Sequence, residues 1–171
     1  MKTTKKLNIL SIDCDWIKNF KQQEDLLSFI IPLIYSHEDV VLALSHVKIY
    51  SLFTHGYDEY NLINIDHHHD FHYMKQLDVL IESNWLFHLS NIFKNKIKYT
   101  WISNPDSQHI DLNQFKNLKS FTFDHNISYI KEKKFDKIFI CCSPDYATHP
   151  EVIVSYKIIE RIINENKKPK P

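Results

Sequence analysis

Six short apolar runs, each ending abruptly in polar residues, constrain the fold of this chain more than any other feature. They are rich in β-branched and aromatic residues, which favour strands, and their near-continuous apolar character is typical of strands covered on both faces. We therefore predict six central strands. In chain order the runs are Leu7 to Ile12, Val40 to Leu44, Leu62 to Ile65, Ile97 to Ile102, Ser120 to Phe123 and Lys137 to Cys142.

Three further segments have the length and apolar period of helices. The last starts with Pro150 and Glu151, a proline and an acid in the first turn, as helix starts favour. Alternating strands and helices predict an α/β fold of three layers, αβα, with a mainly parallel sheet. The segments and their predicted buried stripes are Glu24 to Tyr35 (Leu26, Leu27, Ile30, Ile31, Ile34), Asp78 to Phe93 (Val79, Leu80, Trp85, Leu86, Leu89, Ile92) and Pro150 to Ile163 (Val152, Ile153, Tyr156, Ile159, Ile162, Ile163).

The length and charge of the chain narrow the classes of protein further. Its 171 residues suit one domain over 1–171, with flexible basic tails at 1–6 and 166–171. With 21 basic and 21 acidic residues the formal net charge is zero, which argues against a nucleic-acid partner bound by bulk electrostatics. No run approaches the ~20 apolar residues of a membrane-spanning helix, so we expect no membrane partner.

The cysteines and the single glycine also exclude some functions. Cys14, Cys141 and Cys142 are odd in number and form no Cys-x-x-Cys pattern, which predicts a reducing, cytoplasmic location and not a disulfide framework. We also expect no signal peptide. With only Gly56, the chain cannot form a glycine-rich phosphate loop or a dinucleotide fingerprint.

The polar residues that end the predicted strands are candidate ligands, because open parallel sheets bind ligands beyond the carboxyl ends of their strands. The densest cluster runs from Asp66 to Asp70. If the extended backbone continues, Asp66, His68 and Asp70 share one side, while His67 and His69 face the other. One imidazole with two carboxylates suits Mn, Fe or Zn better than Mg or Ca. The alternative is a polar loop with solvated histidines.

Two more strand ends carry ligand-type residues. Asp13 and Asp15 follow a buried strand at positions i and i+2, so both carboxylates are expected to point the same way. They can instead cap a following helix. Ser45 and His46 end another run, and there too the alternative is a helix cap beside a satisfied histidine. The two acidic segments together are more specific than either alone.

These motifs resemble the arginase/deacetylase superfamily of ureohydrolases, and more closely its small atypical arginases, a branch that includes peptide arginases. The matching positions, from about Leu7 to Pro150, are Asp13, Asp15 and Trp16, then His46, then Asp66, His68 and Asp70, then Asn84 and Trp85, and finally Ser143 and Pro144. The chain departs from ordinary arginases because its Asp-x-Asp motif comes first, Lys48 stands where relatives often have an acid, and no substrate-binding loop is evident.

The resemblance implies two Mn²⁺ ions bridged by Asp66 and Asp13, with His46 and Asp70 completing one ion and His68 and Asp15 the other. It also implies hydrolysis of a guanidinium to urea and an amine, with Asp70 holding the nucleophile and shuttling its proton. The implied substrate is arginine within a peptide, such as a ribosomally made precursor with a leader, converted to ornithine.

Other roles stay open at this point. A guanidinium needs a carboxylate partner, for which Asp145, Asp106 and Asp124 qualify, and Asn84 is a further substrate-binding candidate. The candidate proton-shuttling histidines are His69, His88 and His125. Trp16, Trp101 or Tyr146 either line a peptide groove or pack in the core.

Three rival functions keep the same ligands. The first is an amidinohydrolase or deacylase acting on a small free substrate. The second is a non-catalytic metal-binding protein, and the third is a nuclease or phosphatase.

Overall fold

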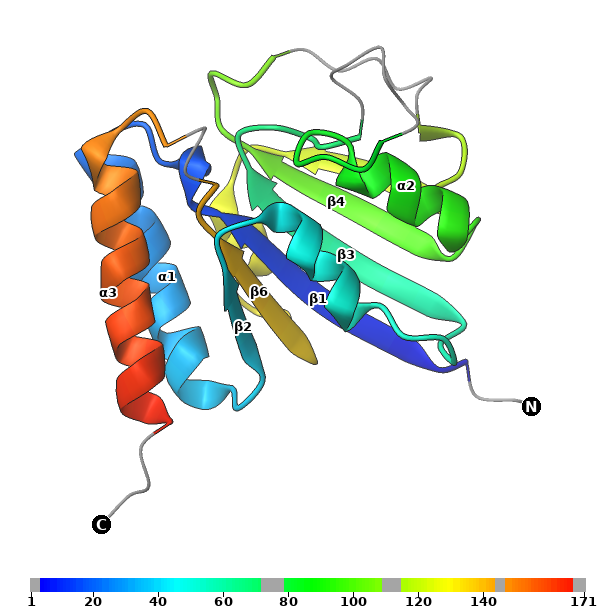
Figure 1. The fold of residues 1–171 in the computed structure, drawn as a ribbon, viewed down its shortest axis with the longest axis horizontal. Helices are drawn as coiled ribbons and strands as arrows, with labels where there is room; N and C mark the ends of the chain where they lie inside the picture. Colours follow the sequence, from blue (N-terminus) through cyan, green and yellow to red (C-terminus); the bar gives the residue numbers. More distant parts are fainter. Residues whose placement is uncertain (1–3, 72–78, 109–114, 144–146, 168–171) are drawn as a thin grey trace.

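The structure is a computed structural model that describes residues 4–71, 79–108, 115–143 and 147–167. Its centre is one parallel sheet of six strands in the order β2-β6-β1-β3-β4-β5, flanked by helices (Figure 1). This confirms the predicted α/β fold with a parallel sheet between helical layers. The strands are β1 (Lys6–Asp13), β2 (Val40–Ala43), β3 (Glu59–Asp66), β4 (Ile97–Ser103), β5 (Ser120–Asp124) and β6 (Lys137–Cys141).

Helices cover both faces of the sheet. The two long helices, α1 (Phe20–Ser36) and α3 (Pro150–Asn166), lie side by side on one face, as Figure 1 shows. The opposite face packs against α2 (Trp85–Ile92) and the 3₁₀ helix η2 (His46–Leu52). Two shorter 3₁₀ helices, η1 (Cys14–Trp16) and η4 (Ile127–Ile130), follow β1 and β5. No helix in the described ranges is long and apolar enough to cross a membrane.

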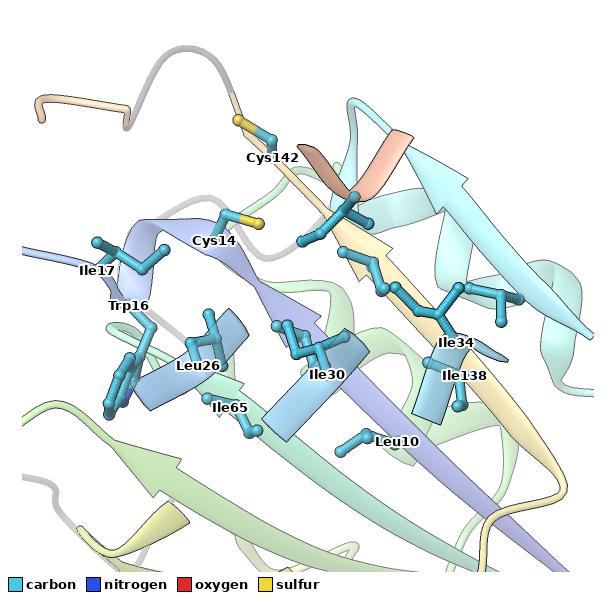
Figure 2. Close-up of a cluster of buried hydrophobic side chains, with 14 of the residues drawn as sticks. Leu10, Cys14, Trp16, Ile17, Leu26, Ile30, Ile34, Ile65, Ile138 and Cys142 are labelled. Carbon is cyan, nitrogen blue, oxygen red and sulfur yellow. The ribbon is translucent and has the colours of Figure 1, made fainter. Parts of the chain in front are cut away.

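Each face of the sheet carries its own apolar core, because alternate strand residues point to opposite faces. Beneath α1 and α3 the core includes Leu10, Ile12, Ile65 and Ile138, together with Leu26 and Ile30 of α1 (Figure 2). Beneath α2 and η2 the core is more aromatic, and it includes Tyr60, Tyr99, Trp85, Trp101 and Phe139. Both faces of β1, β3 and β6 are therefore largely covered, as predicted, whereas Lys98 and Thr100 on one face of β4 are half-buried.

The strands at the two edges of the sheet differ from the prediction. The sheet ends at β5, where every residue is exposed or half-buried, and Phe123 is 44% exposed. The other edge is β2, followed directly by Leu44, which is 60% exposed. Predicting that all six runs are central strands was therefore wrong for these two. An apolar run indicates a strand but does not show whether a second strand lies on each side of it.

The helix boundaries also differ from the prediction. The second predicted helix was to begin at Asp78, but α2 begins at Trp85. The turns before it leave Val79 and Leu80 exposed, and Ile92 at the end of α2 is exposed too. In α3 the predicted start at Pro150 is confirmed, whereas Ile153 is 46% exposed and not buried. The earlier start of α1 follows from Asn19, whose side chain accepts a hydrogen bond from the Gln22 N–H.

The inner residues of the two predicted tails belong to regular elements. Lys6 is the first residue of β1 and pairs with Glu59 of β3, while the Lys5 backbone N–H donates to Asp58. Asn166 ends α3 and donates to the Ile34 carbonyl from its side chain. The polarity of these residues alone predicts tails. Instead, strand pairing and backbone hydrogen bonds hold the residues at the start of β1, and the hydrogen bond of Asn166 holds the end of α3.

Candidate metal centre

The two acidic segments meet at the carboxyl ends of neighbouring strands. Asp13 ends β1 and Asp66 ends β3, and these parallel strands are in register up to the pair Ile12 and Ile65. From β1 the chain crosses to β2 on one side of the sheet and returns to β3 on the other side. Such a reversal of strand order opens the crevice where α/β sheets bind ligands. The fold therefore brings Asp13 and Asp66 together at a ligand-binding position.

His46 brings a ring nitrogen to this pair. It is fully buried at the start of η2, and its Nε2 lies 2.7 Å from the Ser11 hydroxyl. Its Nδ1 lies 3.4 Å from Oδ2 of Asp13, 3.4 Å from Oδ2 of Asp66 and 3.2 Å from Oδ2 of Asp70. None of the three contacts has the geometry of a hydrogen bond, so Nδ1 has no such partner within the described ranges. A cation between these four atoms would satisfy all of them.

A second group of ligand-type residues lies on the other side of Asp66. His68 Nδ1 is 3.0 Å from Oδ2 of Asp15, and the His68 backbone N–H donates to Oδ1 of Asp66 at 2.8 Å. Asp15, Asp66 and His68 offer ligand atoms within 4.8 Å of one another, as do His46, Asp66 and Asp70. Five of the six predicted metal ligands thus lie in two groups that share Asp66, and Asp13 joins them through its contact with His46.

Asp70 reaches the centre through a turn and not along an extended strand. We had expected Asp66, His68 and Asp70 to align by alternation, but β3 ends at Asp66 and Asp70 has a φ of 51°. This left-handed conformation is uncommon for residues other than glycine, although aspartate tolerates it. Backbone strain of this kind costs about 1–3 kcal/mol and often marks a functional site.

Polar side chains beside the centre fix three of the four carboxylates. Trp85 Nε1 donates to Oδ2 of Asp70 at 2.6 Å, and Ser143 Oγ donates to Oδ2 of Asp13 at 2.8 Å. Asn64 Nδ2 donates to Oδ2 of Asp66 at 3.1 Å. Partners of this kind orient metal ligands and raise their basicity. The sequence analysis missed Ser11 and Asn64 as functional positions, although each lies two residues before a ligand and therefore faces the same side of its strand.

Glu82 holds the start of η2 in place. Its carboxylate accepts hydrogen bonds from the backbone N–H groups of His46 at 2.6 Å and Val47 at 3.3 Å, and from the Ser45 hydroxyl. An acid at a helix N-terminus satisfies its unpaired N–H groups. Ser45 makes no side-chain cap of its own, so the alternative in which it caps this helix is wrong. No pattern in the sequence connects Glu82 with His46.

The charges in the centre do not balance. Asp13, Asp15, Asp66 and Asp70 are each at most 5% exposed, and within the described residues the imidazoles that form ion pairs with them are those of His46 and His68. Burial, followed by the charges of the neighbouring aspartates, raises the pKa of Asp66 well above its ordinary value. Burial and repulsion by Asp13 also raise the pKa of Asp15. Burial lowers the pKa of His46, but the carboxylates of Asp13 and Asp70 beside its ring outweigh that effect and raise the pKa to about 9.

These observations fit a metal ion. Buried carboxylates that outnumber their cationic partners are costly unless a cation compensates them. The set of carboxylate oxygens and ring nitrogens is one that divalent cations bind, and a buried ring nitrogen without a hydrogen bond points at three of the oxygens. Three groups of buried or half-buried side chains can each hold a metal ion. They are Asp15 with Asp66 and His68, His46 with Asp66 and Asp70, and Asp13 with His46 and Cys141.

The predicted proton-shuttling histidines have different surroundings. His69 is buried with its ring against Trp101 and Phe115, and its Nδ1 accepts a hydrogen bond from the Phe71 N–H. His88, in α2, has its ring against Phe87. The His125 ring contacts Phe123, and its Nδ1 lies 2.8 Å from Ser103 Oγ at the end of β4.

The predicted substrate-binding residues also differ in their surroundings. Asn84 is fully buried. Its side-chain amide accepts a hydrogen bond from the Ile81 N–H and donates one to the Val79 carbonyl, so it holds the turn before α2 in place. Asp124 accepts hydrogen bonds from two N–H groups that follow it, whereas Asp106 is exposed and its charge acts on His67. Asp145 and Tyr146 lie outside the described residues.

The two described tryptophans that were candidates for a peptide groove are core residues. Trp16 is 5% exposed and Trp101 is fully buried, with its Nε1 donating to the Asp66 carbonyl. The core alternative is therefore confirmed for both.

Comparisons with protein-family models, with curated proteins and with solved structures find no match to this chain. What can be said of its function therefore depends on the geometry of the centre.

Proposed function

We propose that the chain is a binuclear metallohydrolase that hydrolyses the guanidinium of arginine residues in peptides, giving ornithine and urea. The observation that carries the proposal is the pair of ligand groups sharing Asp66, with a buried His46 nitrogen that faces three carboxylates and makes no hydrogen bond within the described residues. The order of ligands along the chain is that of the small atypical arginases, which supplies the expected substrate.

The residues present fit two Mn²⁺ ions. Asp66 and Asp13 would be shared between them, with His46 and Asp70 on one ion and Asp15 and His68 on the other. Each ion would then have one imidazole and otherwise oxygen donors, a set that suits Mn²⁺ better than the all-oxygen shells preferred by Mg²⁺ and Ca²⁺. Two such ions lower the pKa of water toward neutrality and stabilise the charge that develops on the substrate.

The side chains of this protein orient the reaction. Asp70 holds the attacking water at its carboxylate and takes up its proton, while Trp85 fixes that carboxylate through Oδ2. The water oxygen forms a bond to the guanidinium carbon, and the bond from that carbon to the side-chain nitrogen breaks. Asp70 then returns the proton to the departing amine, which leaves ornithine in the peptide and releases urea. Of the two described candidate carboxylates, Asp106 is exposed and its charge acts on His67, beside the ligand His68, so we expect it to bind the guanidinium.

Urea release tests the proposal directly. We expect the Mn²⁺-loaded protein to release urea from an arginine-containing peptide faster than from free arginine, with mass spectrometry locating ornithine in the product. Asp66→Ala and Asp13→Ala should lose both metal and activity. Asp136→Asn is a matched control. Asp136 is an exposed aspartate at the other end of the sheet, and its carboxylate accepts hydrogen bonds from the backbone N–H and the side-chain amide of Asn8. Full activity without bound metal would refute the proposal, and release of phosphate from phosphoesters would replace it with a phosphatase.

A further inference from the structure

Cys141 lies beside the candidate centre. It ends β6, where it is paired in register with Asp13 of the neighbouring parallel strand β1. Residues paired in this way point to the same face of a sheet, about 4.8 Å apart across the strands. The Cys141 sulfur, a carboxylate oxygen of Asp13 and a ring nitrogen of His46 all lie within 4.8 Å of one another. The thiol is therefore close enough to share a cation with two of the ligands.

The other two cysteines point to the opposite face. Cys14 and Cys142 belong to the apolar core beneath α1 and α3, which Figure 2 shows. Cys141 belongs to the core beneath α2 and η2, on the same face as Asp13 and His46. All three thiols are free and buried. The chain thus offers two internal controls with the same chemistry and similar burial.

An independent feature indicates that this corner of the centre accepts a ligand. His46 is fully buried, yet its Nδ1 has no hydrogen-bond partner in the described part of the chain. The Cys141 sulfur has one weak polar neighbour, the Ser143 hydroxyl at 3.5 Å, and that hydroxyl donates to Asp13. A nitrogen, an oxygen and a sulfur ligand therefore converge at one position, which is a set that binds thiophilic cations.

We propose that Cys141 is a sulfur ligand for thiophilic cations such as Zn²⁺, Co²⁺ and Cd²⁺ on the His46 side of the centre, together with Asp13. This deepens the proposed function, because it assumes that the same centre binds metal. On binding, the thiol proton passes to solvent and a bond forms between the sulfur and the metal, with no change in oxidation state.

The consequence is that the two halves of the centre differ in metal preference. The half formed by Asp15, Asp66 and His68 offers oxygen and nitrogen alone. The half with Cys141 adds a soft donor, which favours Zn²⁺ or Cd²⁺ over Mn²⁺. Thiophilic cations should therefore displace Mn²⁺ first from the His46 side and inhibit the hydrolase by occupying it.

Cobalt spectroscopy tests this without reference to activity. The full chain is freed of metal with a chelator and titrated with Co²⁺ alone, and the near-ultraviolet band of a cobalt–thiolate bond is recorded beside the visible ligand-field bands. We expect both kinds of band in the wild type, in Cys14→Ser and in Cys142→Ser. In Cys141→Ser we expect loss of the thiolate band, with ligand-field bands and Mn²⁺ affinity retained.

The outcomes separate this inference from the proposed function. Ligand-field bands without a thiolate band in the wild type would overturn the role of Cys141 and leave the metal centre intact. A thiolate band that persists in Cys141→Ser would also overturn it. Absence of any Co²⁺ or Mn²⁺ binding would overturn both proposals. If Cys141→Ser does not fold, cadmium NMR of the wild type decides, because a sulfur ligand moves the cadmium resonance downfield.

Discussion

The two ends of the sheet both bury carboxylates, but they compensate them in opposite ways. At the amino end, Glu59 is 2% exposed and forms ion pairs with Lys6, Lys98 and Lys119, which come from or precede three different strands. At the carboxyl end, four buried aspartates share two imidazoles. In the Glu59 cluster the lysines outnumber the carboxylate, whereas in the candidate metal centre the carboxylates outnumber the imidazoles.

The pKa values follow this difference. Hydrogen bonds from Lys119 and then from Lys98 and Lys6 lower the pKa of Glu59 to about 2, despite its burial. Burial and the neighbouring aspartates raise the pKa of Asp66. The protein therefore satisfies Glu59 with its own side chains but leaves Asp66 to be satisfied by something else. Burial of an acid does not by itself indicate a metal site; an uncompensated group of buried acids does.

The strongest test of this contrast removes one carboxylate from each end. We expect Asp66→Asn to abolish metal binding and urea release, because Asp66 belongs to both ligand groups. The loss should exceed the roughly 10–100-fold that removing a hydrogen-bond partner of a metal ligand costs. Calorimetric titration with Mn²⁺ and metal analysis provide the measurement. Glu59→Gln serves as the matched control and should bind Mn²⁺ as the wild type does; equal binding by both variants would exclude Asp66 as a ligand.

A smaller effect is expected from the groups behind the ligands. Trp85→Phe keeps the ring but removes the Nε1 donor to Asp70, so Mn²⁺ affinity should fall roughly 10–100-fold. Trp16→Phe is the control, because Trp16 is also buried but its Nε1 has no hydrogen-bond partner in the described structure. The same titration measures both variants. An unchanged affinity in Trp85→Phe would mean that Asp70 is held by other contacts or is not a ligand.

Metal binding should also be visible as thermal stability. A cation that binds the folded state alone stabilises it by about 2.7 kcal/mol at a concentration 100 times its Kd. For a chain of this size that corresponds to a rise in Tm of about 5–10 °C. Differential scanning calorimetry with Mn²⁺ or with a chelator measures it. Asp66→Asn should show no such rise, and an equal rise in that variant would place the stabilising ion elsewhere.

The carboxyl end of the sheet was largely predictable from the sequence. A run such as Leu7 to Ile12 that stops at Asp13 indicates both the strand and the edge at which its last side chain lies. Two such runs with acids at their ends then indicate a shared site once the strands are parallel neighbours. The position of Asp70 was not predictable in the same way, because it depends on a left-handed turn after β3. The contact between Glu82 and His46 joins residues 36 positions apart through a turn with no strand or helix pattern.

The amino end of the sheet was not predicted at all. Glu59 and its three lysines are spread along the chain as single charges, which in a sequence indicate only solvated residues. They meet because Lys6 pairs with Glu59 in the β1–β3 ladder and β4 lies on the other side of β3. Strand order therefore determines this cluster, and strand order was the part of the topology that the apolar runs left open.

The smallest predicted effect concerns this cluster. Glu59→Gln should lower the free energy of unfolding by on the order of 1 kcal/mol at neutral pH, a modest value because the lysine side chains are 42–49% exposed and partly screened by solvent. The pKa of Glu59 is lowered from 4.5 to about 2, so its contribution is complete above about pH 4.5 and is lost as the pH falls toward 2. Urea denaturation of both proteins at decreasing pH measures the difference between them. A difference that stays constant down to pH values near 2 would show that Glu59 stabilises the fold by packing and not by its charge, and the contrast between the two ends of the sheet would then be one of burial alone.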